Sequence, residues 1–154
     1  MKLKSSLLVV RQLDRKFLSL MPLSKISRPS VGWVRLIRTT LNMSLKQLGE
    51  KMGMTPQSVR DIEMREVDGT ITLNTLQNAA KALNMKFVYG FIPIDSSLEK
   101  MIEQRAHDMA SDIVKRTSIT MKLENQENSE ERIKEAIDEL AGDIKREMPK
   151  KLWD

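Results

Sequence analysis

One stretch, Leu45–Glu63, constrains the fold of this chain more than any other, and it reads LKQLGEKMGMTPQSVRDIE. Leucines at helical spacing open it, and Gly53 follows them as a residue that readily adopts the left-handed conformation that ends a helix. Thr55 and Pro56 favour the start of a second helix, because threonine caps unpaired backbone N–H groups and proline is tolerated in the first turn. The pattern predicts two short helices joined by a tight turn.

Two architectures accommodate such a pair of helices. In a helix-turn-helix, the second helix packs on the first through apolar residues, here Val59 and Ile62, and turns its polar side chains outward. In an ordinary helical hairpin within a bundle, the same spacing serves packing alone. Gly49 provides the small side chain that a steep helix crossing needs, and its combination with Gly53 and Val59 favours the helix-turn-helix.

The sequence around this motif resembles a known family. Residues 33–82 resemble the five-helix DNA-binding domain of the Cro and phage-repressor type, the Xre family. A longer stretch that contains GTITLNTL and FVYGFIP resembles a narrower group, mobile mystery protein A, whose members are typically encoded beside a Fic-domain protein. Together the two resemblances cover roughly residues 11–94 and imply a lambda-repressor-like fold that binds DNA.

This resemblance implies which side chains meet DNA. Base-edge contacts fall at the positions of Thr55, Gln57, Ser58 and Asp61, while Arg60 reaches a phosphate or a neighbouring base. Glutamine pairs with adenine, and arginine with guanine, through two hydrogen bonds in the major groove. The first half of the second helix is therefore expected to read the DNA sequence.

The start of the preceding helix is expected to contact the phosphate backbone through Ser44, which also caps that helix, and Lys46. Two positions depart from the family pattern. Leu45 stands where several relatives carry a polar residue that helps to hold the backbone, and Pro56 removes a possible base contact. These departures affect the details of readout and leave the mode of docking unchanged.

An ion pair is implied by the same resemblance. In the repressor family, an arginine at the position of Arg38 pairs with a glutamate at the end of the recognition helix, here Glu63. A partly buried pair would specify how the two helices pack more than it would add stability. The alternative is that these are two unrelated surface charges.

Charge is distributed unevenly along the chain. Residues 1–65 carry 13 Lys and Arg against 4 Asp and Glu, whereas residues 66–154 carry 13 against 17. The basic half contains the helix-turn-helix, as a surface that neutralises DNA phosphates requires. Basic halves also occur in proteins that do not bind nucleic acid, so charge supports the DNA interpretation without establishing it.

Enzymatic chemistry is not expected. The chain has no cysteine and one histidine, His107, which is too few for a transition-metal or nucleophilic site. Its six glycines are isolated, so no phosphate-binding loop forms, and we expect neither a cofactor nor a metal. The opening MKLKSSLLVV is too short for a secretory signal and no segment reaches the length of a membrane span, which predicts a cytoplasmic protein.

Helices are expected over most of the remaining chain. The first covers residues 5–20, and its apolar face is expected to dock on its own domain, on a second copy or on a partner protein. The first helix of the domain proper covers residues 32–41, and a loop with a turn at Asp68–Gly69 follows the recognition helix. A further helix covers residues 73–83. The helices over residues 32–41 and 73–83 are expected to contribute these core residues: Trp33, Leu36, Ile37, Leu41, Leu73, Leu76, Ala80 and Leu83.

The segment KFVYGFIPI, residues 86–94, is rich in β-branched and aromatic residues and predicts a short strand. No hairpin partner is visible nearby in the sequence. The strand could pair with the same strand of a second subunit, which would make the protein a dimer, or the segment could be extended and buried against the domain.

The C-terminal third predicts two further helices. A capping box at Ser96 and Glu99 begins a helix that ends near Arg116, and Ile119, Met121 and Leu123 alternate as in a short strand. A last helix runs from Glu130 to about Glu147. It carries a narrow apolar seam that is typical of pairing with another helix: Ile133, Ile137, Leu140 and Ile144.

The predicted fold is therefore mainly α: a five-helix lambda-repressor-like DNA-binding domain over residues 30–94, an N-terminal helix and linker over 1–29, one short strand, and a helical C-terminal extension over 95–154. The predicted function is sequence-specific transcriptional repression by a homodimer on a palindromic operator, with autoregulation of an operon shared with a Fic-type partner. The alternative is an antitoxin-like interaction protein that binds and silences a Fic-domain partner, with DNA binding secondary. No membrane association is expected.

Overall fold

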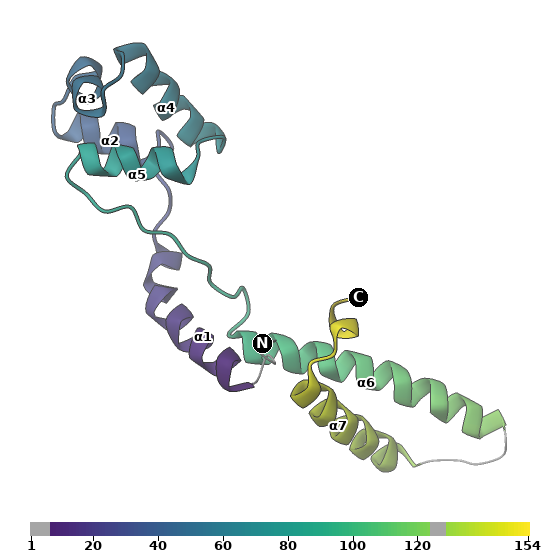
Figure 1. The fold of residues 1–154 in the computed structure, drawn as a ribbon. Coiled ribbons are helices and arrows are strands. Elements are labelled where there is room, and N and C mark those ends of the chain that lie inside the picture. The colour runs from purple at the N-terminus through teal and green to yellow at the C-terminus, as the bar shows by residue number, and fades with distance from the viewer. Residues whose placement is uncertain (1–6, 124–128) are drawn as a thin grey trace. The chain divides into compact units, whose positions relative to one another are not determined.

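Helices form all the regular elements in the part of the chain that the computed structural model describes, residues 7–123 and 129–154 (Figure 1). In chain order they are α1 (Leu7–Leu20), the 3-10 helix η1 (Met21–Lys25), α2 (Trp33–Thr40), α3 (Leu45–Met52), α4 (Pro56–Asp68), α5 (Leu73–Ala82), α6 (Leu98–Leu123), α7 (Glu130–Glu147) and the 3-10 helix η2 (Lys150–Trp153). None of these helices is long and apolar enough to cross a membrane.

The described residues divide into two units, each with its own apolar core. We call the first, Leu23–Gly90, the α2–α5 unit. The second, the α6–α7 unit, combines α1 with the described part of residues 91–154. The N-terminal helix and the C-terminal extension, which the sequence presented as separate segments, thus belong to one unit, because α1 packs on α6.

The core of the α2–α5 unit is formed by one or two apolar residues from each helix: Val34, Leu48, Val59, Ala79 and Leu83. The inward face predicted for α2 was wrong in part. Trp33, Leu36 and Leu41 are 44%, 39% and 55% exposed, whereas Ile37 packs against the core as predicted and Val34, which was not predicted, is buried. Arg38 occupies the next inward position, where its guanidinium meets a buried carboxylate, so the inward face is centred on different residues. The prediction for Leu73 was also wrong, since this residue is 49% exposed.

Helix α4 is longer than predicted, because residues 64–68 continue the helix instead of forming a loop. The stretch Met64–Asp68 contains no strong helix breaker, and the first one is Gly69, which adopts a left-handed conformation with φ of 79° and caps the helix. The predicted turn at Asp68–Gly69 is therefore the C-terminal end of α4. This extra turn carries Glu66, a buried residue of the α2–α5 unit.

The predicted strand at residues 86–94 is not present in the described chain. The segment has no regular secondary structure, and the alternative of a buried extended segment is also wrong, since Val88, Tyr89 and Phe91 are 60%, 62% and 78% exposed. A strand needs a neighbour to pair its backbone groups, and the described residues contain no other strand. The rings of Phe87 and Tyr89 stack with centroids 5.9 Å apart.

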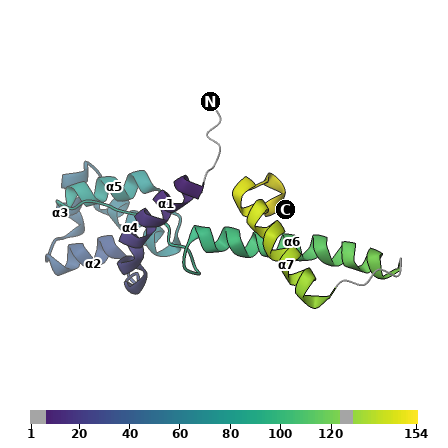
Figure 2. The same ribbon diagram turned by 90° about the horizontal axis from the view of Figure 1, so that it is seen from below.

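Helices α6 and α7 pack against each other, and α7 crosses α6 in the view of Figure 2 (Figures 1 and 2). Ala106 and Ala110 of α6 are fully buried, and their small side chains allow close approach of the helices. The seam of α7 is buried against its own chain, where Ile137 and Ile144 lie in the core. Helix α6 continues to Leu123, so the short strand predicted there is also wrong.

Helix α6 begins with a cap from a different helix. The carboxylate of Asp14, on α1, accepts hydrogen bonds from the backbone N–H groups of Leu98 (2.7 Å) and Glu99 (3.1 Å). Ser97, one residue later than the predicted cap, accepts from the N–H of Lys100. The capping box predicted at Ser96 and Glu99 is therefore wrong, because Glu99 turns outward to two cations.

Glu99 joins the three helices of its unit. It accepts hydrogen bonds from Arg11 of α1 (2.9 Å) and from the ammonium of Lys145 on α7 (3.0 Å). The hydrogen bond from Arg11, followed by that from Lys145, lowers the pKa of Glu99 from 4.5 to about 2. Lys145 also donates to Glu103 at 2.6 Å, which raises the pKa of Lys145.

We expect Glu99→Gln to destabilise the α6–α7 unit by about 1 kcal/mol at pH 7, a value reduced for the solvent screening of a carboxylate that is 24% exposed. A carboxyl group whose pKa is lowered on folding stabilises fully above its unfolded pKa and loses this effect as pH falls through its folded pKa. The difference between wild type and variant should therefore shrink from about pH 4.5 to about pH 2. Urea unfolding followed by Trp153 fluorescence in a Trp33→Phe background measures it.

Glu103→Gln is the matched control, since Glu103 is 51% exposed and Lys145 is its one ionic partner among the described residues. Glu103→Gln should lower the free energy of unfolding less than Glu99→Gln does at every pH. A Glu99→Gln difference that stays constant between pH 7 and about pH 2 would contradict the assigned ionic role.

Candidate nucleic-acid interface

The interface predicted from the sequence lies on α3, α4 and the turn between them. Ser44 caps α3 with a capping box: its Oγ accepts from the backbone N–H of Gln47 at 3.1 Å, and its own N–H donates to the Gln47 side chain at 2.8 Å. The Ser44 hydroxyl proton remains available to a phosphate oxygen. Lys46, in the first turn of the same helix, is exposed.

The turn is tightly built around two glycines. Gly53 has φ of 67°, in the left-handed region, and ends α3. Gly49 faces the turn itself: a Cβ placed there would lie 2.6 Å from the backbone oxygen of Met54. The Met54 N–H donates to the Gly49 carbonyl at 2.8 Å, so backbone meets backbone at this point. The small residue is thus required by the turn as well as by the helix crossing.

Helix α4 starts with residues that serve both packing and the predicted interface. Thr55 Oγ1 accepts from the Ser58 N–H at 3.1 Å and lies 2.9 Å from the Ser58 hydroxyl, while Pro56 occupies the first helical position. Val59 and Ile62 are buried against the other helices. The side of α4 that carries Gln57, Arg60 and Asp61 is consequently exposed.

Gln57 and Asp61 are held together, since the Gln57 amide donates to Asp61 at 3.2 Å. An amide nitrogen has two hydrogens, so Gln57 retains one donor and its carbonyl acceptor for a base edge. These are the two groups that pair with adenine N7 and N6. Arg60, on the next turn, is also exposed.

Arg38 and Glu63 meet in a two-point ion pair. Arg38 Nε donates to Glu63 at 2.5 Å and an Nη donates to the second carboxylate oxygen at 3.2 Å. The other Nη donates to the Met43 carbonyl at 2.8 Å. The side chains are only 11% and 7% exposed. This pair ties α2 to α4, the helix that presents the interface.

A second tie between the same helices was missed by the sequence analysis. Both carboxylate oxygens of Glu66 accept backbone N–H groups at the start of α2, from Trp33 at 2.7 Å and from Val34 at 2.9 Å. Gly32 precedes them with φ of 81°, and a Cβ there would lie 2.9 Å from the Glu66 carboxylate. Glu66 therefore acts as the N-cap side chain that glycine cannot provide.

Arg28 completes this arrangement by donating to the carbonyls of Glu66 (3.2 Å) and Val67 (3.3 Å) in the last turn of α4. A signal for Glu66 existed in the sequence. It lies seven residues after Val59, on the buried side of α4, and an acid in a buried position needs a partner. The sequence analysis missed this spacing because it predicted that the recognition helix ends at Glu63 and that the next nine residues, 64–72, form the loop with the turn at Asp68–Gly69.

The α2–α5 unit is basic, with ten Lys and Arg against five Asp and Glu in Leu23–Gly90. Two of the five acids, Glu63 and Glu66, are buried and engaged with protein donors. The exposed surface is therefore more positive than the count alone indicates, which favours a polyanionic ligand.

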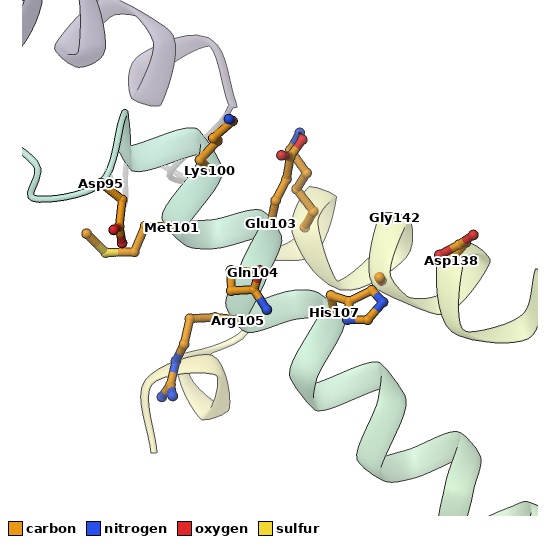
Figure 3. Close-up of a pocket in the computed structure, with 11 residues that line it drawn as sticks. Asp95, Lys100, Met101, Glu103, Gln104, Arg105, His107, Asp138 and Gly142 are labelled. Atoms are coloured by element: carbon orange, nitrogen blue, oxygen red, sulfur yellow. Dashed lines mark hydrogen bonds and ion pairs between the residues drawn. The ribbon is translucent and has the colours of Figure 1, made fainter. Parts of the chain in front are cut away.

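The α6–α7 unit contains a shallow cavity, which Figure 3 shows with its lining side chains. Its volume is about 930 Å³, and His107 of α6 lines it together with Asp138 and Gly142 of α7. His107 is exposed there. Within residues 7–123 and 129–154, no group of three or more His, Cys, Asp and Glu side chains is placed to hold a metal ion.

Two helices joined by a tight glycine turn, with the second presenting polar side chains on a basic unit, define a DNA-binding domain of the helix-turn-helix class. Residues 34–89, from α2 into the segment after α5, match the helix-turn-helix family, of the Xre and Cro type. This match supports the broad family and does not extend to the narrower mobile mystery protein A group. No curated protein and no solved structure matches the chain.

Proposed function

We propose that this protein is a sequence-specific transcriptional repressor that reads DNA with the exposed face of α4. The observation that carries the proposal is the placement of Gln57, Arg60 and Asp61 on the solvent side of a helix whose opposite side is buried. The N-terminal end of such a helix enters the major groove first, which brings Gln57 closest to the base edges. Ser44 and Lys46, at the start of α3, bind the flanking phosphates, and Thr55 and Ser58 lie at the edge of the groove.

The repressor acts as a homodimer on a palindromic operator in this proposal. Exposed apolar side chains of the segment after α5, among them Val88, Tyr89 and Phe91, support a surface that a second chain covers. A twofold dimer would place two recognition helices on half-sites one turn of DNA apart. The resemblance to genes encoded beside Fic-domain proteins supports autoregulation of a shared operon.

A second candidate function follows from α1. Leu8 and Leu18 of this helix are 64% and 65% exposed, so α1 has apolar surface beyond what α6 covers. This surface favours an antitoxin-like protein that binds a Fic-domain partner. Coexpression with the neighbouring gene product followed by copurification tests it, and Leu18→Asp should abolish a complex built on α1.

DNA reading is tested by selecting a binding site from randomised duplexes and measuring affinity for the selected and scrambled sites. We expect Gln57→Ala and Arg60→Ala each to weaken binding to the selected site by about 1–3 kcal/mol, which is roughly 5- to 150-fold. A base-reading side chain loses preference at one base pair, whereas a phosphate contact weakens binding to all sequences alike.

Arg65→Ala is the control, because Arg65 is an exposed arginine of the same helix near its far end. It should change affinity for the selected site far less than Arg60→Ala. Equal losses for Arg60→Ala and Arg65→Ala, or unchanged binding by both Gln57→Ala and Arg60→Ala, would remove α4 as the reading helix.

A further inference from the structure

The α2–α5 unit contains a cavity of about 610 Å³ that DNA reading does not use. Its walls come from α2, the C-terminal end of α4, α5, and the segments that flank these helices, residues 23–28 and 85–88. Two of the apolar lining residues, Val34 and Leu83, belong to the core of the unit and are 4% and 6% exposed. The volume falls within the range of small-molecule sites, which are concave and mostly apolar.

We propose that this cavity binds a small amphipathic anion, an aromatic or otherwise flat apolar body that carries one acidic group. Two aromatic residues line the cavity, Trp33 and Phe87, and Trp33 is 44% exposed. The indole N–H has no hydrogen-bond partner in residues 7–123 and 129–154, so a ligand acceptor can take it. Flat rings stack favourably on such side chains.

The charge of the lining selects an anion. Three ionic side chains line the cavity: Arg28, Glu66 and Lys86. Glu66 accepts two backbone N–H groups and Arg28 donates to two backbone carbonyls. Lys86 is exposed and makes no hydrogen bond or ion pair within the described chain, so its ammonium is available to the acidic group of a ligand in the cavity that it lines.

The site is coupled to the recognition helix by its own lining. Glu66 and Gly69 belong to the end of α4, and Arg28 holds the last carbonyls of that helix. The acidic group of a bound ligand competes with the α4 carbonyls for Arg28, and its apolar body contacts the start of α2. Ligand binding therefore changes the affinity of the unit for DNA, and DNA binding changes its affinity for the ligand. This regulatory step rests on the proposed function, whereas ligand binding itself does not.

Anilinonaphthalenesulfonate, which is anionic, and its neutral analogue phenylnaphthylamine are matched fluorescent probes for this site. With the full chain, we expect the anion to bind about tenfold more tightly than the neutral probe. This is the gain in affinity expected from one partly buried, charge-assisted hydrogen bond. Lys86→Glu should weaken the anion about tenfold or more and change the neutral probe less than about twofold. Lys81→Glu makes the same charge change on exposed α5 surface outside the cavity and should leave both affinities unchanged.

Ala80→Met fills the cavity and should weaken both probes, with circular dichroism confirming that the helices persist. Equal effects of Lys86→Glu and Lys81→Glu would overturn the site, as would unchanged binding in Ala80→Met while the other variants remain folded. DNA affinity measured with saturating anion separates the two claims. Bound probe with unchanged DNA affinity overturns the regulatory step alone, and absence of DNA binding without probe overturns the proposed function instead.

Discussion

Glu63→Ala should lower the free energy of unfolding of the α2–α5 unit by about 3 kcal/mol, because it leaves the Arg38 guanidinium buried with the Met43 carbonyl as its remaining partner. Arg38→Ala should lower the free energy of unfolding by a similar amount, because it leaves the buried Glu63 carboxylate without its cationic partner. The double variant should cost less than the sum by about 2 kcal/mol, since removing both charges leaves neither one unpaired. Chemical denaturation followed by Trp33 fluorescence in a Trp153→Phe background isolates this unit.

Strict additivity of the two single variants would contradict the ion pair. A further variant, Arg38→Met with Glu63→Leu, tests what the pair contributes. Replacement of a buried ion pair by apolar residues of similar volume is often neutral in stability. We expect this variant to unfold near the wild-type midpoint yet to bind the selected DNA site less tightly, because the pair specifies the angle between α2 and the recognition helix.

The substitution of alanine for glycine should have opposite effects at two helical positions. Gly49→Ala should destabilise the α2–α5 unit by about 3 kcal/mol, since its Cβ would lie 2.6 Å from the Met54 backbone oxygen. That oxygen belongs to a turn whose N–H is bound to the Gly49 carbonyl, so it cannot shift without loss of the hydrogen bond. DNA affinity should fall with it, because this turn sets where α4 begins.

Gly142→Ala is the matched control within α7. A Cβ at this position meets nothing within 4 Å, and alanine is a better helix former than glycine by up to about 1 kcal/mol. The free energy of unfolding of the α6–α7 unit should therefore be unchanged or higher in Gly142→Ala, as measured by Trp153 fluorescence in a Trp33→Phe background. A neutral Gly49→Ala would show that the turn relaxes, and the explanation given for Gly49 would then be wrong.

Much of the helix-turn-helix could be predicted from the sequence, because its features depend on residues that are neighbours in the chain. The caps at Ser44 and Thr55, the left-handed Gly53 and the small Gly49 each depend on a few neighbouring residues, so their patterns predict the observed geometry. The exposed placement of Gln57 and Arg60 follows from the burial of Val59 and Ile62 on the opposite side of α4. The family match at residues 34–89 agrees with this local interpretation.

Contacts between distant residues were decided by the tertiary structure alone. Glu66 caps a helix that starts 33 residues earlier, and Asp14 caps one that starts 84 residues later, and no local pattern specifies such partners. The same limit explains the errors. Apolar residues at 86–94 predicted a strand, but a strand forms only beside another one. The seam of α7 required a partner, and only the folded chain could show that this partner is α6.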